Sequence, residues 1–240
     1  MTYAIMLAAG RGSRLSPLTD TRPKPLITVQ GVTLLERNMK AISNIVDGYV
    51  LVIGYLGEMI IEHIGETLEG KPVTYVRQDN PKGGTLDAFR AGTTALPSSE
   101  CNMIVMNSDD IHGGDIFENL SSHISEYPDT PALASYVYPI KERLSQFGII
   151  EETTPGVFGQ IVEKPQEYVS DLVNIGIYYY PAHTRSLIPE KPEVYQGEEY
   201  ITDFLNILNE KFSIKNLYSR EFWMPVSTLE DVKHAEMQKI

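Results

Sequence analysis

The 240-residue sequence has a single cysteine, Cys101, so no disulfide can form within the chain. Its five histidines are scattered, and none is spaced from Cys101 or from another histidine as zinc ligands are. No apolar run reaches the roughly 18 residues that suggest a membrane span. The short apolar stretch near the N-terminus follows no basic residue, which argues against a signal peptide. We therefore expect a cytoplasmic protein without a zinc site or a membrane partner.

Positive charge is also scarce. The chain has 20 Lys and Arg residues against 32 Asp and Glu residues, a formal net charge of −12. A surface this acidic argues against nonspecific nucleic-acid binding and against docking on anionic membranes. Hydrophobic residues make up 42% and charged residues 22%, as in an ordinary globular protein. If the ligands are phosphates, positive charge must be gathered locally.

The first half of the chain alternates apolar strands with amphipathic helices, which predicts an α/β fold in three layers with a mostly parallel sheet and helices on both faces. The predicted strands are Tyr3–Ala8, Tyr49–Ile53, Val73–Val76 and Met103–Met106. The predicted helices are Thr33–Ile45, Glu58–Ile64 and Thr85–Ala95.

The order of predicted elements changes after Ser121, where strands follow one another with short connections instead of alternating with helices. This half is predicted to add antiparallel strands to the same sheet, or to form a small antiparallel lobe beside it. The predicted strands are Ala132–Tyr138, Gly148–Glu151, Val157–Glu163 and Asn174–Tyr180. A helix is expected over Tyr200–Lys211, and the capping-box spacing of Ser227 and Glu230 predicts a last helix from Leu229 to near Ile240. We find no linker and expect one domain over residues 1–240.

The loop after the first strand concentrates the chemistry. Gly10 and Gly12 allow the backbone to approach a ligand closely, and bare amides in such a loop form an anion-binding concavity. Asp20 is the only acid in residues 7–26. On a chain of net charge −12, this local reversal of sign favours a polyphosphate site. The basic residues of the span are Arg11, Arg14, Arg22 and Lys24.

Other interpretations of this loop fit less well. A plain surface loop explains the glycines but not the local excess of positive charge. A dinucleotide-binding fingerprint, G-x-G-x-x-G, requires glycine where the sequence has Leu15, and prolines follow where a helix should begin. The P-loop pattern G-x-x-x-x-G-K-[ST] is absent.

The stretch LAAGRGSRLSPLT…RPKPL resembles the signature loop of the sugar-phosphate nucleotidyltransferases, the NDP-sugar pyrophosphorylases. The resemblance implies a Rossmann-like core, with a nucleotide-binding half at about 1–120 and a sugar-phosphate-binding half at about 121–240. It implies that a nucleoside triphosphate and a sugar 1-phosphate react to give an NDP-sugar and pyrophosphate. Further matches cover nearly the whole chain: Val52–Glu58, Gln78 with Gly84 and Thr85, Asp109, Phe147–Gly148, Glu163–Pro165 and Asn174–Tyr178.

The resemblance also implies roles for single residues. Arg14 would clamp the triphosphate and the leaving pyrophosphate, and Lys24 would contact the α-phosphate and the incoming phosphate. Asp109 would bind Mg²⁺, with Asp110 as the second choice; from position alone Asp109 is equally well a turn acid after a strand. The implied nucleotide-binding residues are Leu7, Ala9, Gly10, Gly12, Gln78, Gly84 and Thr85. The implied sugar-phosphate-binding residues are Gly148, Glu163, Lys164, Asn174 and Gly176.

One segment departs from the family's pattern. The family usually closes its site with Trp/Tyr-x-Asp-x-Gly-Thr, whose aspartate is a second metal ligand. This chain has Pro225 at that position, and proline offers no ligand atom. Two alternatives therefore stay open: a non-catalytic nucleotide-sugar-binding homologue, and a cytidylyltransferase that uses a phosphoalcohol such as phosphocholine. The base, the sugar and the oligomeric state are not determined by the sequence, which is compatible with a homo-oligomer.

Overall fold

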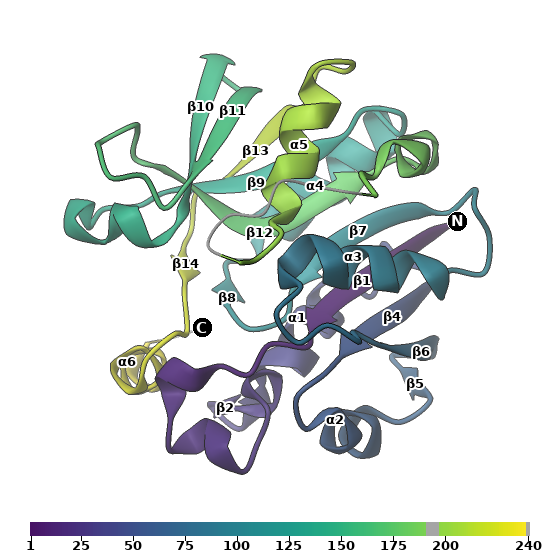
Figure 1. The fold of residues 1–240 in the computed structure, drawn as a ribbon, viewed down its shortest axis with the longest axis vertical. Coiled ribbons are helices and arrows are strands. Elements are labelled where there is room, and N and C mark those ends of the chain that lie inside the picture. The colour runs from purple at the N-terminus through teal and green to yellow at the C-terminus, as the bar shows by residue number, and fades with distance from the viewer. Residues whose placement is uncertain (191–196, 239–240) are drawn as a thin grey trace.

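The computed structural model of the chain describes residues 1–190 and 197–238. Within these ranges ten strands form one continuous sheet (Figure 1). Their order across the sheet is β10 (Gly148–Thr154), β11 (Val157–Glu163), β13 (Lys215–Ser219), β9 (Ala132–Val137), β12 (Leu172–Tyr180), β7 (Asn102–Asn107), β1 (Thr2–Ala8), β4 (Gly48–Ile53), β6 (Lys71–Arg77) and β5 (Thr67–Leu68).

The sheet is mixed. Strands β7, β1, β4 and β6 are parallel neighbours, as predicted for the first half of the chain. Strand β12 then runs antiparallel to both β7 and β9, and β10 pairs antiparallel with β11. The predicted mixed character is confirmed. Parallel pairing dominates only in the first half, because in the second half β13 and β9 are parallel whereas the other pairs named here are antiparallel. The second half extends the same sheet, because β12 pairs directly with the central strand β7.

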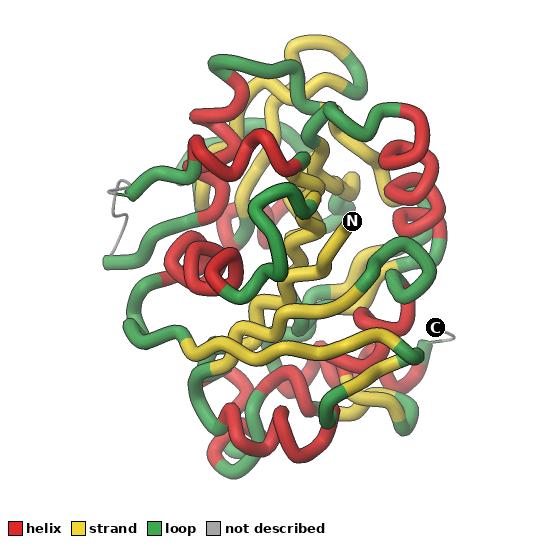
Figure 2. Tube along the Cα trace, turned by 90° about the vertical axis from the view of Figure 1, so that its right-hand side faces the viewer, coloured by secondary structure: helices red, strands yellow, loops and turns green. Residues whose placement is uncertain are grey.

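Helices cover both faces of this sheet, and Figure 2 shows the strands between them. The side chains of β1 alternate, so Ala4 and Met6 enter one core while Ile5 enters the other. The first core contains residues of α1 (Leu34–Ala41), α2 (Gly57–Ile64) and α4 (Asp115–Glu126). The second contains residues of α3 (Gly84–Thr94) and α5 (Ile201–Asn209). The three-layer arrangement is confirmed.

Several element boundaries differ from the prediction. Helix α1 ends at Ala41, four residues before the predicted end at Ile45, and the Thr33 side chain caps its start by accepting the amide N–H of Glu36. Helix α4 and strand β13 were not predicted at all. They pack against each other, and both contribute to the first core. In α4 the buried Ile116, Phe117 and Leu120 recur at helical spacing, which is a local signal that the sequence analysis did not use.

The last helix, α6 (Leu229–Met237), has a capping box one residue later than predicted. Thr228, not Ser227, is the N-cap, and Asp231 occupies the position expected for Glu230. The reason is that the Asp231 carboxylate accepts two backbone N–H groups, from Ser227 at 2.9 Å and from Thr228 at 2.8 Å. The predicted end near Ile240 lies outside the described residues.

A third, smaller core joins the two ends of the chain. Val226 and Ala235 pack with Leu15 and Ile27, which belong to the glycine-rich loop region. Two short hairpin strands, β2 (Thr28–Val29) and β3 (Val32–Thr33), continue this region, and α6 contacts β2. The C-terminal segment therefore buttresses the loop that carries Arg14 and Lys24. Among the described helices, none has the length and apolar character needed to cross a bilayer.

Candidate active site

Two cavities open at the carboxyl ends of the parallel strands, where α/β folds bind ligands. The first cavity has a volume of about 410 Å³. All seven residues predicted to bind the nucleotide line it: Leu7, Ala9, Gly10, Gly12, Gln78, Gly84 and Thr85. They come from β1 and the loop after it, from the end of β6, and from the start of α3.

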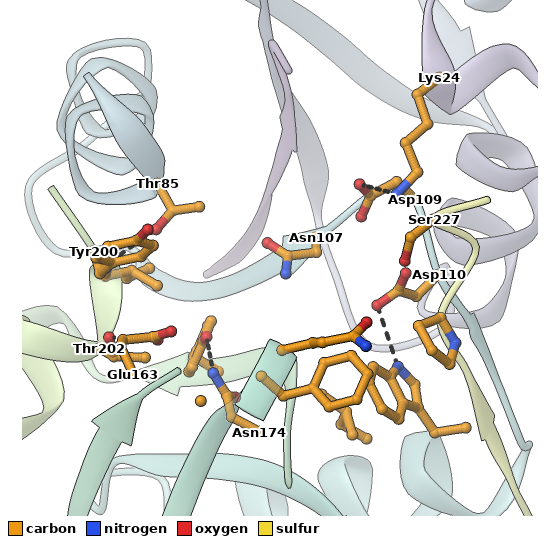
Figure 3. A pocket seen from close by; sticks show the side chains of 18 of the residues that line it. Lys24, Thr85, Asn107, Asp109, Asp110, Glu163, Asn174, Tyr200, Thr202 and Ser227 are labelled. Atoms are coloured by element: carbon orange, nitrogen blue, oxygen red, sulfur yellow. Dashed lines mark hydrogen bonds and ion pairs between the residues drawn. The ribbon is translucent and has the colours of Figure 1, made fainter. Parts of the chain in front are cut away.

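The second cavity, of about 210 Å³, lies between the glycine-rich loop and the antiparallel half of the sheet. The predicted residues that line it are Arg14, Lys24, Thr85, Asp109, Gly148, Glu163 and Asn174, together with Asp110, the second choice for the metal. Arg14 is thus on this side of the site rather than in the first cavity. Figure 3 shows polar side chains from both halves of the chain converging on the space between them.

Three residues, Thr85, Asn107 and Asp109, line both cavities. The two spaces therefore adjoin at the end of β7, and a ligand group at this junction would touch both. Asn107 was not singled out in the sequence, although its position at the end of an apolar strand is a usable signal. Other lining residues that the sequence analysis missed are Tyr178, Tyr200, Thr202 and Trp223.

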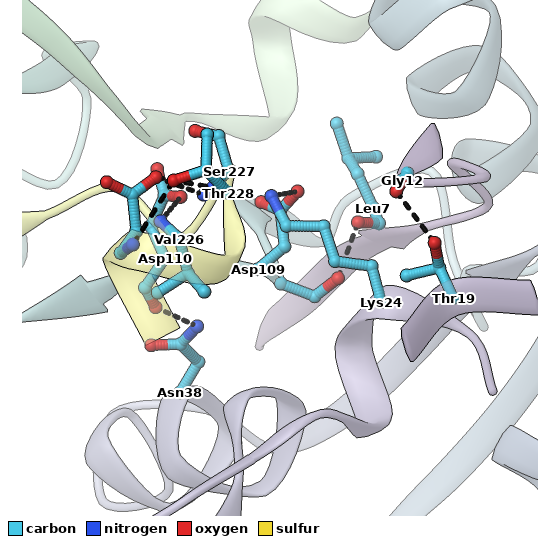
Figure 4. A network of polar contacts seen from close by, with 12 residues as sticks. Leu7, Gly12, Thr19, Lys24, Asn38, Asp109, Asp110, Val226, Ser227 and Thr228 are labelled. Carbon is cyan, nitrogen blue, oxygen red and sulfur yellow. Dashed lines mark hydrogen bonds and ion pairs between the residues drawn. The ribbon is translucent and has the colours of Figure 1, made fainter. Parts of the chain in front are cut away.

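The glycine-rich loop is shaped by local geometry. Gly12 has φ +64°, in the left-handed region that favours glycine. A Cβ at this position would lie 2.8 Å from Cβ of Lys24, so glycine also makes room for the lysine stem. The Thr19 hydroxyl donates to the Gly12 carbonyl at 2.9 Å. The hydrogen bond between Thr19 and Gly12, drawn in Figure 4, folds the loop back on itself, and Lys24 extends from it toward Asp109 at the junction.

Lys24 Nζ lies 2.7 Å from Asp109 Oδ2, and the lysine side chain is only 12% exposed. Burial lowers the pKa of Lys24, but the charges of Asp109 and Asp110 outweigh this effect and the net pKa is raised. The ammonium therefore stays protonated at neutral pH. The charged Lys24 ammonium can contact an anion such as a phosphate. The Asp109 carboxylate beside it can serve as a ligand for a cation.

Asp110, the neighbouring acid, has a different role. Its carboxylate accepts the indole N–H of Trp223 and the backbone N–H of Val226, both at 3.2 Å. It lies therefore against the segment that contains Pro225. Burial, and next the charge of Asp109, raise the pKa of Asp110 to about 7. Asp110 anchors the segment 223–226 and lines the second cavity, whereas Asp109 lines both cavities.

The far end of the second cavity is lined by uncharged donors around one acid. The Thr202 hydroxyl donates to Glu163 Oε1 at 2.9 Å, and burial raises the pKa of the Glu163 carboxyl. Asn174 Nδ2 donates to the Tyr178 hydroxyl at 2.7 Å. A carboxylate with hydroxyl and amide neighbours is suited to a ligand that carries several hydroxyl groups.

Two predicted residues do not line either cavity. Gly176 has φ +72°, and a Cβ there would overlap Asn107 Nδ2, so this glycine leaves space for the junction residue. Lys164 lies beside the second cavity, where its Nζ donates to the hydroxyl of the lining residue Tyr200 at 2.8 Å. The structure therefore places both in contact with lining residues rather than in the lining.

Comparison with known proteins agrees with the geometry. The chain matches the family model for nucleotidyl transferases over residues 3–239, and it belongs to the nucleotidyl transferase family. The resemblance drawn from the glycine-rich loop is thereby confirmed.

The individual relatives share about 30% of their residues with this chain or fewer. The bifunctional protein GlmU of Methanococcus maripaludis is 30% identical over 97% of this chain and 53% of its own length. The UTP–glucose-1-phosphate uridylyltransferase AglF of Haloferax volcanii is 28% identical over 85% of this chain and 82% of its own length. The chain thus spans about half the length of the first of these relatives. A solved UDP-glucose pyrophosphorylase in complex with UDP-glucose has the same fold, with a TM-score of 0.85 and 21% identity over 98% of this chain and 97% of its own.

Proposed function

We propose that the chain condenses a nucleoside triphosphate with a sugar 1-phosphate to give an NDP-sugar and pyrophosphate. The observation that carries this proposal is the pair of adjoining cavities that share Asn107 and Asp109, with Lys24 at the junction. The first cavity would hold the nucleotide and the second the sugar phosphate. Residues 1–120 would then supply most of the nucleotide side and residues 121–240 most of the sugar side, within one domain.

The chemistry requires no protein nucleophile. An oxygen of the sugar phosphate attacks the α-phosphorus, a new P–O bond forms, and the bond from the α-phosphorus to the β-phosphate oxygen breaks as pyrophosphate leaves. The protein must hold two anions together and stabilise the charge that develops between them. Lys24 would contact the reacting phosphates. Arg14 would contact the neighbouring phosphates of the triphosphate and the leaving pyrophosphate. Lys164, next to the second cavity, would meet the phosphate of the sugar 1-phosphate.

The residues present fit a Mg²⁺ ion. Asp109 Oδ2 is paired with the Lys24 ammonium at 2.7 Å, so the ion would bind through the other carboxylate oxygen or compete with the lysine for this one. Mg²⁺ is commonly held by one or two carboxylates together with substrate phosphates, so a full protein cage is not needed. In the described part of the chain no three acidic, histidine or cysteine side chains form such a cage. We propose that Asp109 holds the ion, which would neutralise phosphate charge when bound.

A two-dimensional substrate screen tests the proposal. Pyrophosphate release is measured with Mg²⁺ for dTTP, UTP, CTP, GTP and ATP, each against a panel of sugar 1-phosphates, with phosphocholine as a further acceptor. Pyrophosphate release with at least one sugar 1-phosphate is the expected result. No pyrophosphate release in any combination would refute the proposal.

Pro225 motivates one alternative, a binding protein without turnover. Its prediction is thermal stabilisation by an NDP-sugar with no pyrophosphate release from any pair. Release with phosphocholine alone would instead support the phosphoalcohol alternative. The cytoplasmic location and the oligomeric state stay predictions that this screen does not address.

A further inference from the structure

Lys164 has an unusual backbone for a side chain of its size. Its φ is +45°, in the left-handed region that non-glycine residues seldom adopt. It follows Glu163, the last residue of β11, and its N–H donates to the Phe147 carbonyl at 3.0 Å. The next residue, Pro165, cannot continue a strand ladder. The turn at Lys164 therefore ends the strand and redirects the lysine.

Tyr200 receives the redirected side chain. The Lys164 ammonium donates to the Tyr200 hydroxyl at 2.8 Å and lies 5.0 Å from the centroid of the tyrosine ring. The hydroxyl is thus the group of Tyr200 that contacts the ammonium. Lysine has a flexible four-carbon stem, and such contacts reduce the number of positions its charge can take.

Tyr200 is itself held between the two cavities. Its hydroxyl donates to Glu198 Oε2 at 3.2 Å, and Glu198 lines the first cavity while Tyr200 lines the second. The residue after it, Ile201, donates its backbone N–H to the Thr85 hydroxyl at 2.9 Å. Thr85 belongs to both cavities, so the tyrosine is tied to the junction itself.

We propose that Tyr200 is a positioning residue that holds the Lys164 ammonium at the edge of the second cavity, where it meets the phosphate of the sugar 1-phosphate. This inference rests on the proposed function. Tyr200 acts through Lys164, so its loss affects binding of the sugar phosphate and leaves binding of the nucleotide and the chemical step nearly unchanged.

The test compares Tyr200→Phe, which removes the hydroxyl and keeps the ring, with Tyr200→Leu, which removes both. We expect KM for the sugar 1-phosphate to rise about tenfold in Tyr200→Phe and at least as much in Tyr200→Leu, as for the loss of a hydrogen bond to a charged group. KM for the triphosphate and kcat should change by less than about twofold. Thermal denaturation of each variant shows whether it is folded.

Tyr168→Phe is the matched control. Lys141 Nζ lies 5.5 Å from the Tyr168 ring centroid, so this is a second lysine–tyrosine pair, and Tyr168 is 66% exposed. The Tyr168→Phe variant should have unchanged kinetic constants, because neither Lys141 nor Tyr168 lines either cavity.

A double-mutant cycle separates positioning from a general structural effect. In a Lys164→Met background, Tyr200→Phe should change KM for the sugar 1-phosphate by less than about twofold, because the group it positions is gone. An equal effect in both backgrounds, or none in the wild-type background, overturns the proposal while leaving the transferase activity intact. Absence of turnover in the wild-type protein would instead defeat the proposed function.

Discussion

The Lys24 ammonium and the Asp109 carboxylate are 85 residues apart in sequence and 2.7 Å apart in space. The contact arises because each residue follows a parallel strand of the same sheet. Strands β1 and β7 are direct neighbours, with Leu7 opposite Asn107 in the register. Their carboxyl ends therefore meet at one edge, and the loops that follow bring opposite charges together at the junction of the two cavities.

Lys24→Ala should lower kcat/KM for pyrophosphate release by about two to three orders of magnitude, as loss of one preorganised charge contact does in other enzymes. The variant also leaves Asp109 without its ion-pair partner. Lys40→Ala is the control, because this lysine is 47% exposed on α1 and pairs with Glu36 at 3.9 Å, away from both cavities. Activity of Lys24→Ala within about fivefold of the wild type would contradict the assigned role.

Glu163 should make stability depend on pH in the ligand-free protein. Burial raises its pKa above the usual 4.5, so the folded state binds its proton more tightly than the unfolded state does. Stability from this group is therefore present at low pH and is lost as the pH rises from about 4.5 through the raised value. The Glu163→Gln variant has no titrating group at this position, so its stability lacks this pH-dependent contribution.

The melting temperature of the wild type relative to Glu163→Gln should accordingly fall between about pH 4 and about pH 7. Chemical denaturation at both pH values measures the same difference as a free energy. A difference that stays constant with pH, or grows in favour of the wild type at the higher pH, would show that Glu163 is not buried as described.

Gly176→Ala should lower both stability and activity. Its φ of +72° costs an alanine about 1–2 kcal/mol. The new Cβ would also collide with the Asn107 amide, for which overpacking adds about 1–3 kcal/mol. Gly70→Ala is the matched control, because Gly70 has the same φ of +72° and a Cβ placed there would meet no atom within 4 Å.

The difference between these two variants in urea denaturation isolates the contact with Asn107. Gly70→Ala should keep full activity, whereas Gly176→Ala should lose activity because it displaces a residue of the junction. Equal losses in the two variants would mean that Gly176 matters for its backbone alone.

Pro225→Asp should strengthen Mg²⁺ binding. Pro225 and Asp109 line the same cavity, so an aspartate there adds a carboxylate to a site that has few. We expect a roughly tenfold lower half-saturating Mg²⁺ concentration, because affinity rises with the charge of the ligand set. Without metal, the added charge near the partly buried Asp110 should lower the melting temperature.

Titration calorimetry with Mg²⁺ and thermal denaturation with EDTA measure these two effects of Pro225→Asp. Pro225→Ala controls for loss of the ring. Unchanged Mg²⁺ affinity would place position 225 out of reach of the metal.

The resemblance found in the glycine-rich loop was sufficient to identify the family, because a long motif of specific residue types is a local property of the chain. The predicted nucleotide-binding residues also share one cavity, since they all follow strands or begin helices at the same edge of a parallel sheet. Asn107 ends an apolar strand at this same edge, so its position is a usable signal although no motif marks it. Tyr200 could not be selected in this way, because it gains its place from contacts with Lys164 and Glu198.

Local pattern determined the alternating strands and helices of the first half and the unusual gathering of positive charge in an acidic chain, since periodicity and composition need no knowledge of distant residues. The tertiary structure decided that β12 pairs with β7, which makes one mixed sheet of both halves. It also decided that Asp110 anchors the segment around Pro225, because the hydrogen bonds from Trp223 and Val226 to the Asp110 carboxylate exist only once the chain has folded.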